Sequence, residues 1–117
     1  MKSATSADTA NGKAKRFIVK MIGRHTRAIK EFITIVDAKD AHLMRSYYWS
    51  AICNHPRHLE GGNVYIIRKG TKGDEFLHSV IADAKPGEMV MHINGNSLDN
   101  RRANLLRQSE RVQEIEE

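Results

Sequence analysis

The stretch MHINGNSLDNRRANL, residues 91–105, gathers side chains that could do chemistry together. His92 follows a short apolar run, and asparagines, an aspartate and two arginines follow it before Leu105. An imidazole can take up a proton, amides can hold a loop by hydrogen bonds, and guanidinium groups can bind phosphate. The cluster therefore raises the question of whether it cuts a phosphodiester bond or retains only the residue pattern of a cleavage site.

The elements that must position this cluster are short. β-branched and apolar runs predict strands, and Pro, Gly and Asn-Gly pairs predict the turns between them. We expect strands at residues 17–22, 32–36, 49–53, 64–70 and 89–93. A helix is predicted from Asp37, as N-cap, to about Tyr47, and a second, short helix near His78. This pattern predicts a small α+β domain of mixed short strands.

Composition restricts the class of protein. A chain of 117 residues fits one domain, and it has no apolar run of the roughly 18–20 residues that a membrane helix needs. The N-terminus lacks the apolar region of a secretory signal, and Cys53 is the only cysteine. A disulfide framework is excluded, and we expect a cytoplasmic protein.

The positive charge is concentrated at the N-terminus. Residues 1–30 hold eight Lys and Arg against one acid, whereas the net charge of the whole chain is +5. We expect a disordered basic arm over residues 1–15 and a folded domain over 16–117, because the first fifteen residues have almost nothing apolar to bury. Such an arm favours a polyanion, most simply DNA, although a solubilising tail has the same composition.

The segment LHSVIADAKPGEMVMHINGNSLDNRRANL, residues 77–105, resembles the small HNH (ββα-metal) endonucleases of phages and mobile elements. A weaker likeness extends over residues 33–113. The resemblance implies a ββα-metal motif at the C-terminal end of the domain. It implies that His92 is the general base. It also implies that Asn104 holds the following strand against the loop that comes after His92, which we call the histidine loop.

The metal positions depart from the family pattern. The resemblance places one ligand of Mg²⁺ or Mn²⁺ directly before His92 and the other at Gln113, but the first position holds Met91, whose thioether does not suit these ions. An active site would need Mg²⁺ or Mn²⁺, with Asp99 or Glu110 replacing the missing ligand. Otherwise the protein needs no cofactor.

Other residues are candidates for binding. The sequence predicts DNA contacts from basic residues of the arm, a hairpin and the histidine loop, namely Lys13, Lys15, Arg16, Arg68, Lys69, Arg101 and Arg102. His78 either faces the site or is a structural histidine. Cys53, His55 and His58 could bind zinc, although no fourth ligand is evident and a loop explains the run equally well.

We therefore expect a DNA-binding protein with a degenerate HNH-like site, acting as a non-cleaving regulator or inhibitor. The first alternative is an active, metal-dependent nicking endonuclease. The second is a protein-interaction module that inhibits a host protein. Met91 is the feature against the enzyme, and the basic arm favours DNA over a protein partner alone.

Overall fold

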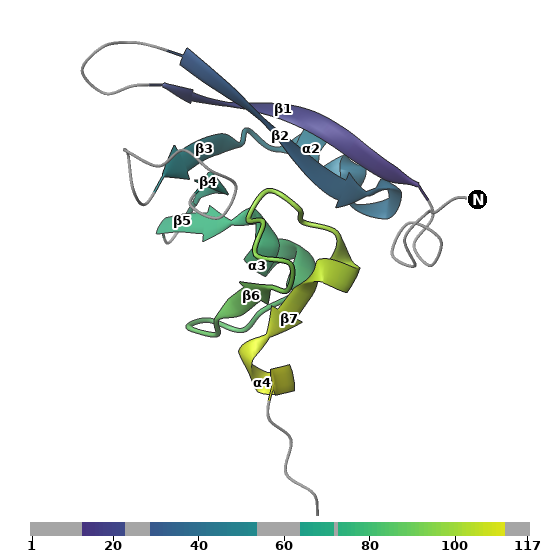
Figure 1. Cartoon of the computed structure of the whole chain (residues 1–117). Coiled ribbons are helices and arrows are strands. Elements are labelled where there is room, and N and C mark those ends of the chain that lie inside the picture. The colour runs from purple at the N-terminus through teal and green to yellow at the C-terminus, as the bar shows by residue number, and fades with distance from the viewer. Residues whose placement is uncertain (1–12, 23–28, 54–63, 72, 112–117) are drawn as a thin grey trace, which may run out of the picture.

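The computed structural model describes residues 13–22, 29–53, 64–71 and 73–111. Its strands pair antiparallel and most of them are short, and its few helices have one or two turns (Figure 1). The α+β class expected from the sequence is confirmed. Within the described residues, no helix is long and apolar enough to span a membrane.

The first two strands form an antiparallel hairpin, which we call the ribbon. It consists of β1 (Ala14–Ile22) and β2 (Ile29–Asp37), with Ile18 opposite Ile33. Alternate residues of each strand point to opposite faces, so Val19 is buried while Ile18 is exposed. Both strands extend beyond the predicted ranges of residues 17–22 and 32–36. Residues 1–12 of the expected arm lie outside the described residues.

The helix predicted from residue 37 to about 47 is shorter and divided. A 3₁₀ turn, η1 (Ala38–Asp40), leads into α2 (Ala41–Ser46), and Tyr47 is extended. Asp37 occupies the predicted N-cap position of η1, but its side chain makes no capping hydrogen bond. Its Oδ2 accepts the backbone N–H of Arg102 at 2.9 Å, and its buried Oδ1 has no hydrogen-bond partner among the described residues.

A three-stranded sheet follows, with β4 in its centre. It is formed by β3 (Ser50–Cys53), β4 (Val64–Gly70) and β5 (Gly73–Phe76), and α3 (Leu77–Ala82) continues directly from it. The predicted strand over residues 64–70 and the short helix beginning near His78 are both confirmed.

The C-terminal part is a small hairpin with a long loop. β6 (Val90–His92) pairs with β7 (Leu105–Arg107), and the 3₁₀ turn η3 (Arg102–Asn104) ends the loop. Gly95 has a φ of 79°, the left-handed conformation that an Asn-Gly turn favours. The short helix α4 (Gln108–Arg111) follows β7.

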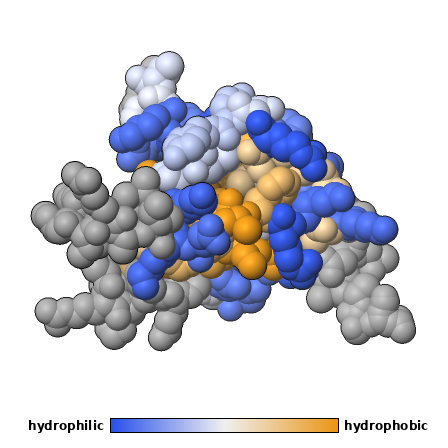
Figure 2. All heavy atoms as spheres, turned by 90° about the horizontal axis from the view of Figure 1, so that it is seen from above, coloured by the Kyte–Doolittle hydropathy of each residue, from blue (hydrophilic) through white to orange (hydrophobic). Residues whose placement is uncertain are grey.

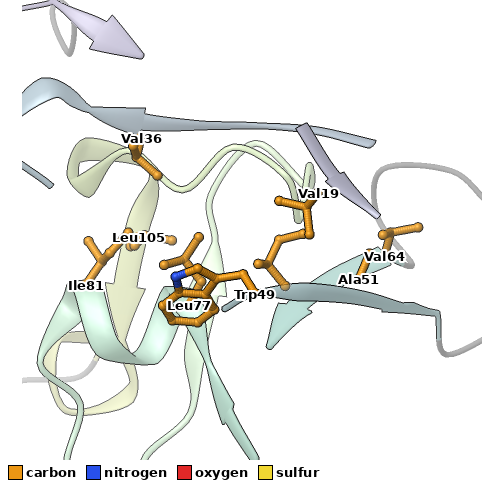
Figure 3. Packing of buried hydrophobic residues seen from close by; sticks show 9 residues of the cluster. Val19, Val36, Trp49, Ala51, Val64, Leu77, Ile81 and Leu105 are labelled. Carbon is orange, nitrogen blue, oxygen red and sulfur yellow. The ribbon is translucent and has the colours of Figure 1, made fainter. Parts of the chain in front are cut away.

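The hydrophobic core lies between the ribbon, the three-stranded sheet and α3. Val19 and Val36 from the ribbon, Trp49, and Leu77 and Ile81 from α3 form its centre (Figure 3). The indole Nε1 of Trp49 donates to the carbonyl oxygen of Leu43 at 2.8 Å, so the one polar atom of this ring is satisfied. The C-terminal hairpin contributes Leu105 to the same cluster, which ties the histidine loop to the fold.

Candidate functional site

His92 stands at the last position of β6, where the strand opens into the loop. Its ring is half-buried and lines a pocket of about 350 Å³. The wall of this pocket is formed by Tyr65, Met89, Val90, Met91, Gly95 and Ser97. A histidine at the edge of a hollow can contact both the protein and a bound molecule.

A chain of hydrogen bonds fixes the orientation of His92. The hydroxyl of Thr34 donates to the carbonyl oxygen of Leu98 at 2.8 Å, so the hydroxyl oxygen accepts from Asn100 Nδ2 at 2.9 Å. Asn100 Oδ1 then accepts from His92 Nε2 at 2.9 Å. The neutral imidazole therefore carries its proton on Nε2 and its lone pair on Nδ1. This is the protonation state that a general base requires.

The ring of His92 belongs to a cluster of four rings. The rings of His78 and His92 meet edge to face with centroids 4.8 Å apart, and Phe76 stacks on His78 at 5.1 Å. Tyr65 contacts both histidine rings, with centroids 5.8 Å from His78 and 6.4 Å from His92. His78 is only 8% exposed, so its place among aromatic rings resembles that of a core residue.

Burial controls the charge of both histidines. Desolvation, helped by the nearby His92, lowers the pKa of His78 to about 4. Burial also lowers the pKa of His92, but the hydrogen bond to Asn100 and the charge of Asp99 act in the opposite direction. Both rings are therefore neutral at neutral pH.

Asn104 ties the histidine loop together. Its Oδ1 accepts the backbone N–H of Asn94 at 2.9 Å, and its Nδ2 donates to Asn94 Oδ1 at 2.9 Å and to the carbonyl oxygen of Asp99 at 2.8 Å. The backbone N–H of Ile93 also donates to the Asn104 carbonyl oxygen at 2.8 Å. Asn104 is buried, and these hydrogen bonds connect the start of the loop to its end.

The two arginines of the loop form ion pairs. Arg101 binds Asp99 through two hydrogen bonds of 2.9 and 2.8 Å, and Arg102 binds Asp40 in the same way at 2.9 and 2.7 Å. Burial opposes ionisation of Asp99, but the hydrogen bonds and charge of Arg101 outweigh it and lower its pKa. Both predicted phosphate-binding arginines are thus engaged by carboxylates.

The donors around His92 do not fit Mg²⁺ or Mn²⁺. Met91 is exposed at the pocket wall, and a thioether is a soft ligand. Asp99 is held by Arg101 and Asn94, and Glu110 accepts the backbone N–H of Arg107 at 3.0 Å. No group of three His, Cys, Asp or Glu side chains with the placing of metal ligands occurs among the described residues. Gln113 lies outside them.

The remaining predicted DNA contacts divide into two groups. Arg68 donates to Glu75 at 2.6 Å and lies over the rings of Tyr47 and Trp49, while the exposed Lys69 lies 3.3 Å from Asp74. Lys13 precedes the ribbon, and Lys15 and Arg16 lie on β1; all three are exposed. In the part of the chain that the structure describes, none of these three forms an ion pair.

Sequence reasoning missed the residues that orient His92. Asn100 is nearly fully buried and Thr34 is fully buried, and 66 positions separate them. Asn100 could have been suspected from the polar LDNRR run, but no local pattern marks a threonine within a strand. Of the suggested zinc ligands, Cys53 ends β3, whereas His55 and His58 lie outside the described residues.

The comparisons with known proteins found no match: no family model, no curated protein and no solved structure is similar to this chain.

Proposed function

We propose that this protein binds DNA and does not cleave it, using a domain that resembles an HNH endonuclease with a degenerate metal site. The observation that carries the proposal is the placing of the unpaired cations. Lys13, Lys15, Arg16, Lys20 and Lys30 belong to the ribbon or border it, and none of them pairs with a carboxylate within the described residues.

Outside the ribbon, most of the described cations already pair with a carboxylate, although Lys39, Arg45 and Lys85 do not. Arg101 and Arg102, in the loop after His92, are neutralised by Asp99 and Asp40, and Arg68 is neutralised by Glu75. A cation that is already paired with a carboxylate gains less free energy from binding a phosphate, because its existing ion pair must be broken or shared. The positive potential available to a polyanion is therefore greatest over the ribbon.

The experiment compares two sets of charge removals in a gel shift with duplex DNA. The first variant is Arg16→Gln/Lys20→Gln, which removes two charges from one face of β1, and the matched control is Lys69→Gln/Lys85→Gln, which removes equal charge from exposed positions outside the ribbon. Each lost phosphate contact should reduce the log–log salt slope by up to about 0.9, so the ribbon variant should lose up to about 1.8. The control should keep most of the wild-type slope, and equal losses in both would refute the ribbon as the contact.

A second candidate function is a metal-dependent nicking endonuclease. The observation in its favour is the tautomer of His92, whose Nδ1 lone pair suits a general base. Incubation of supercoiled plasmid with Mg²⁺, Mn²⁺ or EDTA separates the two candidates. We expect no metal-dependent nicking, whereas nicking that His92→Ala abolishes would replace the non-cleaving proposal with the enzyme.

A further inference from the structure

The outward face of the ribbon carries an exposed apolar pair. Ile18 on β1 and Ile33 on β2 are cross-strand partners, and they expose 62% and 54% of their surfaces. Viewed onto the ribbon, a hydrophobic patch lies between hydrophilic side chains (Figure 2). Two large apolar side chains facing solvent side by side mark an interaction surface more often than isolated ones do.

The charges around Ile18 and Ile33 indicate which kind of molecule binds to this face. Arg16 and Lys20 flank Ile18 on the same face of β1, and Glu31 is the acid opposite Lys20. If two copies paired through β1 around a twofold axis at Ile18, Arg16 of each copy would oppose Lys20 of the other. Like charges directly opposite in a sheet are unfavourable, so the edge of β1 does not favour pairing with a second copy. On the outward face itself, Arg16 and Lys20 outnumber Glu31, and this net positive charge suits a polyanion.

The dimensions of the ribbon suit the major groove of B-form DNA. That groove is about 12 Å wide and admits a two-stranded β-ribbon. Arg16 and Lys20 are four residues apart, which is roughly 13 Å along a strand, so their side chains can reach phosphates on both sides of the groove. An apolar side chain between them would then face the base edges, where the methyl group of thymine offers an apolar contact.

We propose that the outward face of the ribbon enters the major groove of duplex DNA and that Ile18 and Ile33 contact thymine methyl groups. This inference rests on the proposed DNA binding. It adds that the DNA is bound in its major groove, that β1 and β2 make the contacts, and that the contacted feature of the bases is the methyl group of thymine. Double-stranded RNA is a poor ligand for the same face, because its major groove is deep and narrow and its uracils lack the methyl group.

The test removes the methyl groups from the DNA and leaves the protein intact. A short duplex of mixed sequence is compared with the same duplex in which deoxyuridine replaces every thymidine, at one fixed salt concentration. Wild-type protein should bind the thymine duplex more tightly, by a factor of roughly four for each buried methyl group. The Ile18→Ala/Ile33→Ala variant should bind both duplexes alike, whereas Ile93→Ala, which alters an isoleucine of similar exposure outside the ribbon, should keep the wild-type preference.

Three other outcomes are informative. If wild-type protein binds neither duplex, DNA binding itself fails. If it binds both equally, DNA binding stands and the reading of thymine by this face is overturned. If sedimentation shows a wild-type dimer that Ile18→Ala/Ile33→Ala dissociates, the patch is an interface between copies, and the inference is also overturned.

Discussion

At the scale of single residues, His78 shows how burial sets a charge. Its pKa of about 4 lies well below the value of 6.5 for an unperturbed histidine, because the ring is packed between Phe76, Tyr65 and His92. Above pH 6.5 the ring is neutral in both the folded and the unfolded chain. As the pH falls from 6.5 towards 4, the unfolded chain takes up a proton that the folded protein cannot, so stability is lost.

We therefore expect His78→Phe to flatten the pH dependence of stability. Phenylalanine keeps an aromatic ring against Phe76 and Tyr65 but cannot be protonated. Between about pH 7.5 and pH 5 the variant should lose roughly 2 kcal/mol less unfolding free energy than wild type does. Chemical denaturation at the two pH values measures this difference, and parallel losses in both proteins would mean that His78 titrates normally.

Met91 is the residue whose replacement most directly restores a hard metal ligand. Met91→Asp places a carboxylate at the pocket wall beside His92, and carboxylate is the ligand that Mn²⁺ and Mg²⁺ prefer. Calorimetric titration with Mn²⁺ should show affinity about an order of magnitude above wild type. The control is Ile93→Asp, on the other side of His92 and outside the pocket lining; equal gains in both would show only a general effect of added charge.

At the scale of elements, local patterns predicted most strands and turns correctly. β4 begins and ends at the predicted residues, and Asn94-Gly95 forms the predicted turn, since both depend on residues that are neighbours in sequence. The helical segment predicted after β2 is present but divided into η1 and α2, and the carboxylates of Asp37 and Asp40 bind Arg102, a partner that no local window contains. The orientation of His92 escaped prediction for the same reason, as it depends on Thr34.

The shape of the histidine loop depends on the hydrogen bonds of Asn104. Asn104→Ala removes its bonds to Asn94 and Asp99 and leaves buried polar groups without partners, which should cost about 1–3 kcal/mol of unfolding free energy. Asn96→Ala is the matched control, because the amide of this exposed residue can be replaced by water. Thermal denaturation of both variants provides the measurement, and equal melting temperatures would contradict this structural role of Asn104.

At the scale of the whole molecule, Arg102 joins the N-terminal and C-terminal halves. Its guanidinium group binds Asp40, which is 1% exposed, and its backbone N–H binds Asp37. The hydrogen bond to Asp40 raises the pKa of Arg102 and outweighs burial, which opposes its charge. A second link lies beside this one, where the backbone of Ile35 bonds to Leu98 and Asn100.

Arg102→Leu should therefore destabilise the protein strongly. It leaves the buried carboxylate of Asp40 without its two hydrogen bonds from Arg102; because the Arg102 side chain is itself 46% exposed, water can partly replace it, and the cost should be about 1.5–3 kcal/mol. Arg107→Leu is the control, because Arg107 and Glu110 form a more exposed pair at 3.6 Å whose loss should cost about 1 kcal/mol or less. Urea denaturation would disprove the linking role of Arg102 if the two substitutions had similar effects.

The same link has a consequence for the protein as it leaves the ribosome. Asp40 is made 62 residues before Arg102, and Thr34 is made 66 residues before Asn100. At about 5–20 residues per second, the ribbon waits for several seconds before its partners are synthesised. During that interval the carboxylates of Asp37 and Asp40 lack Arg102, and the backbone of Ile35 on β2 lacks its partners Leu98 and Asn100. Nascent chains arrested before Arg102 should therefore be cut by proteases that spare the finished protein.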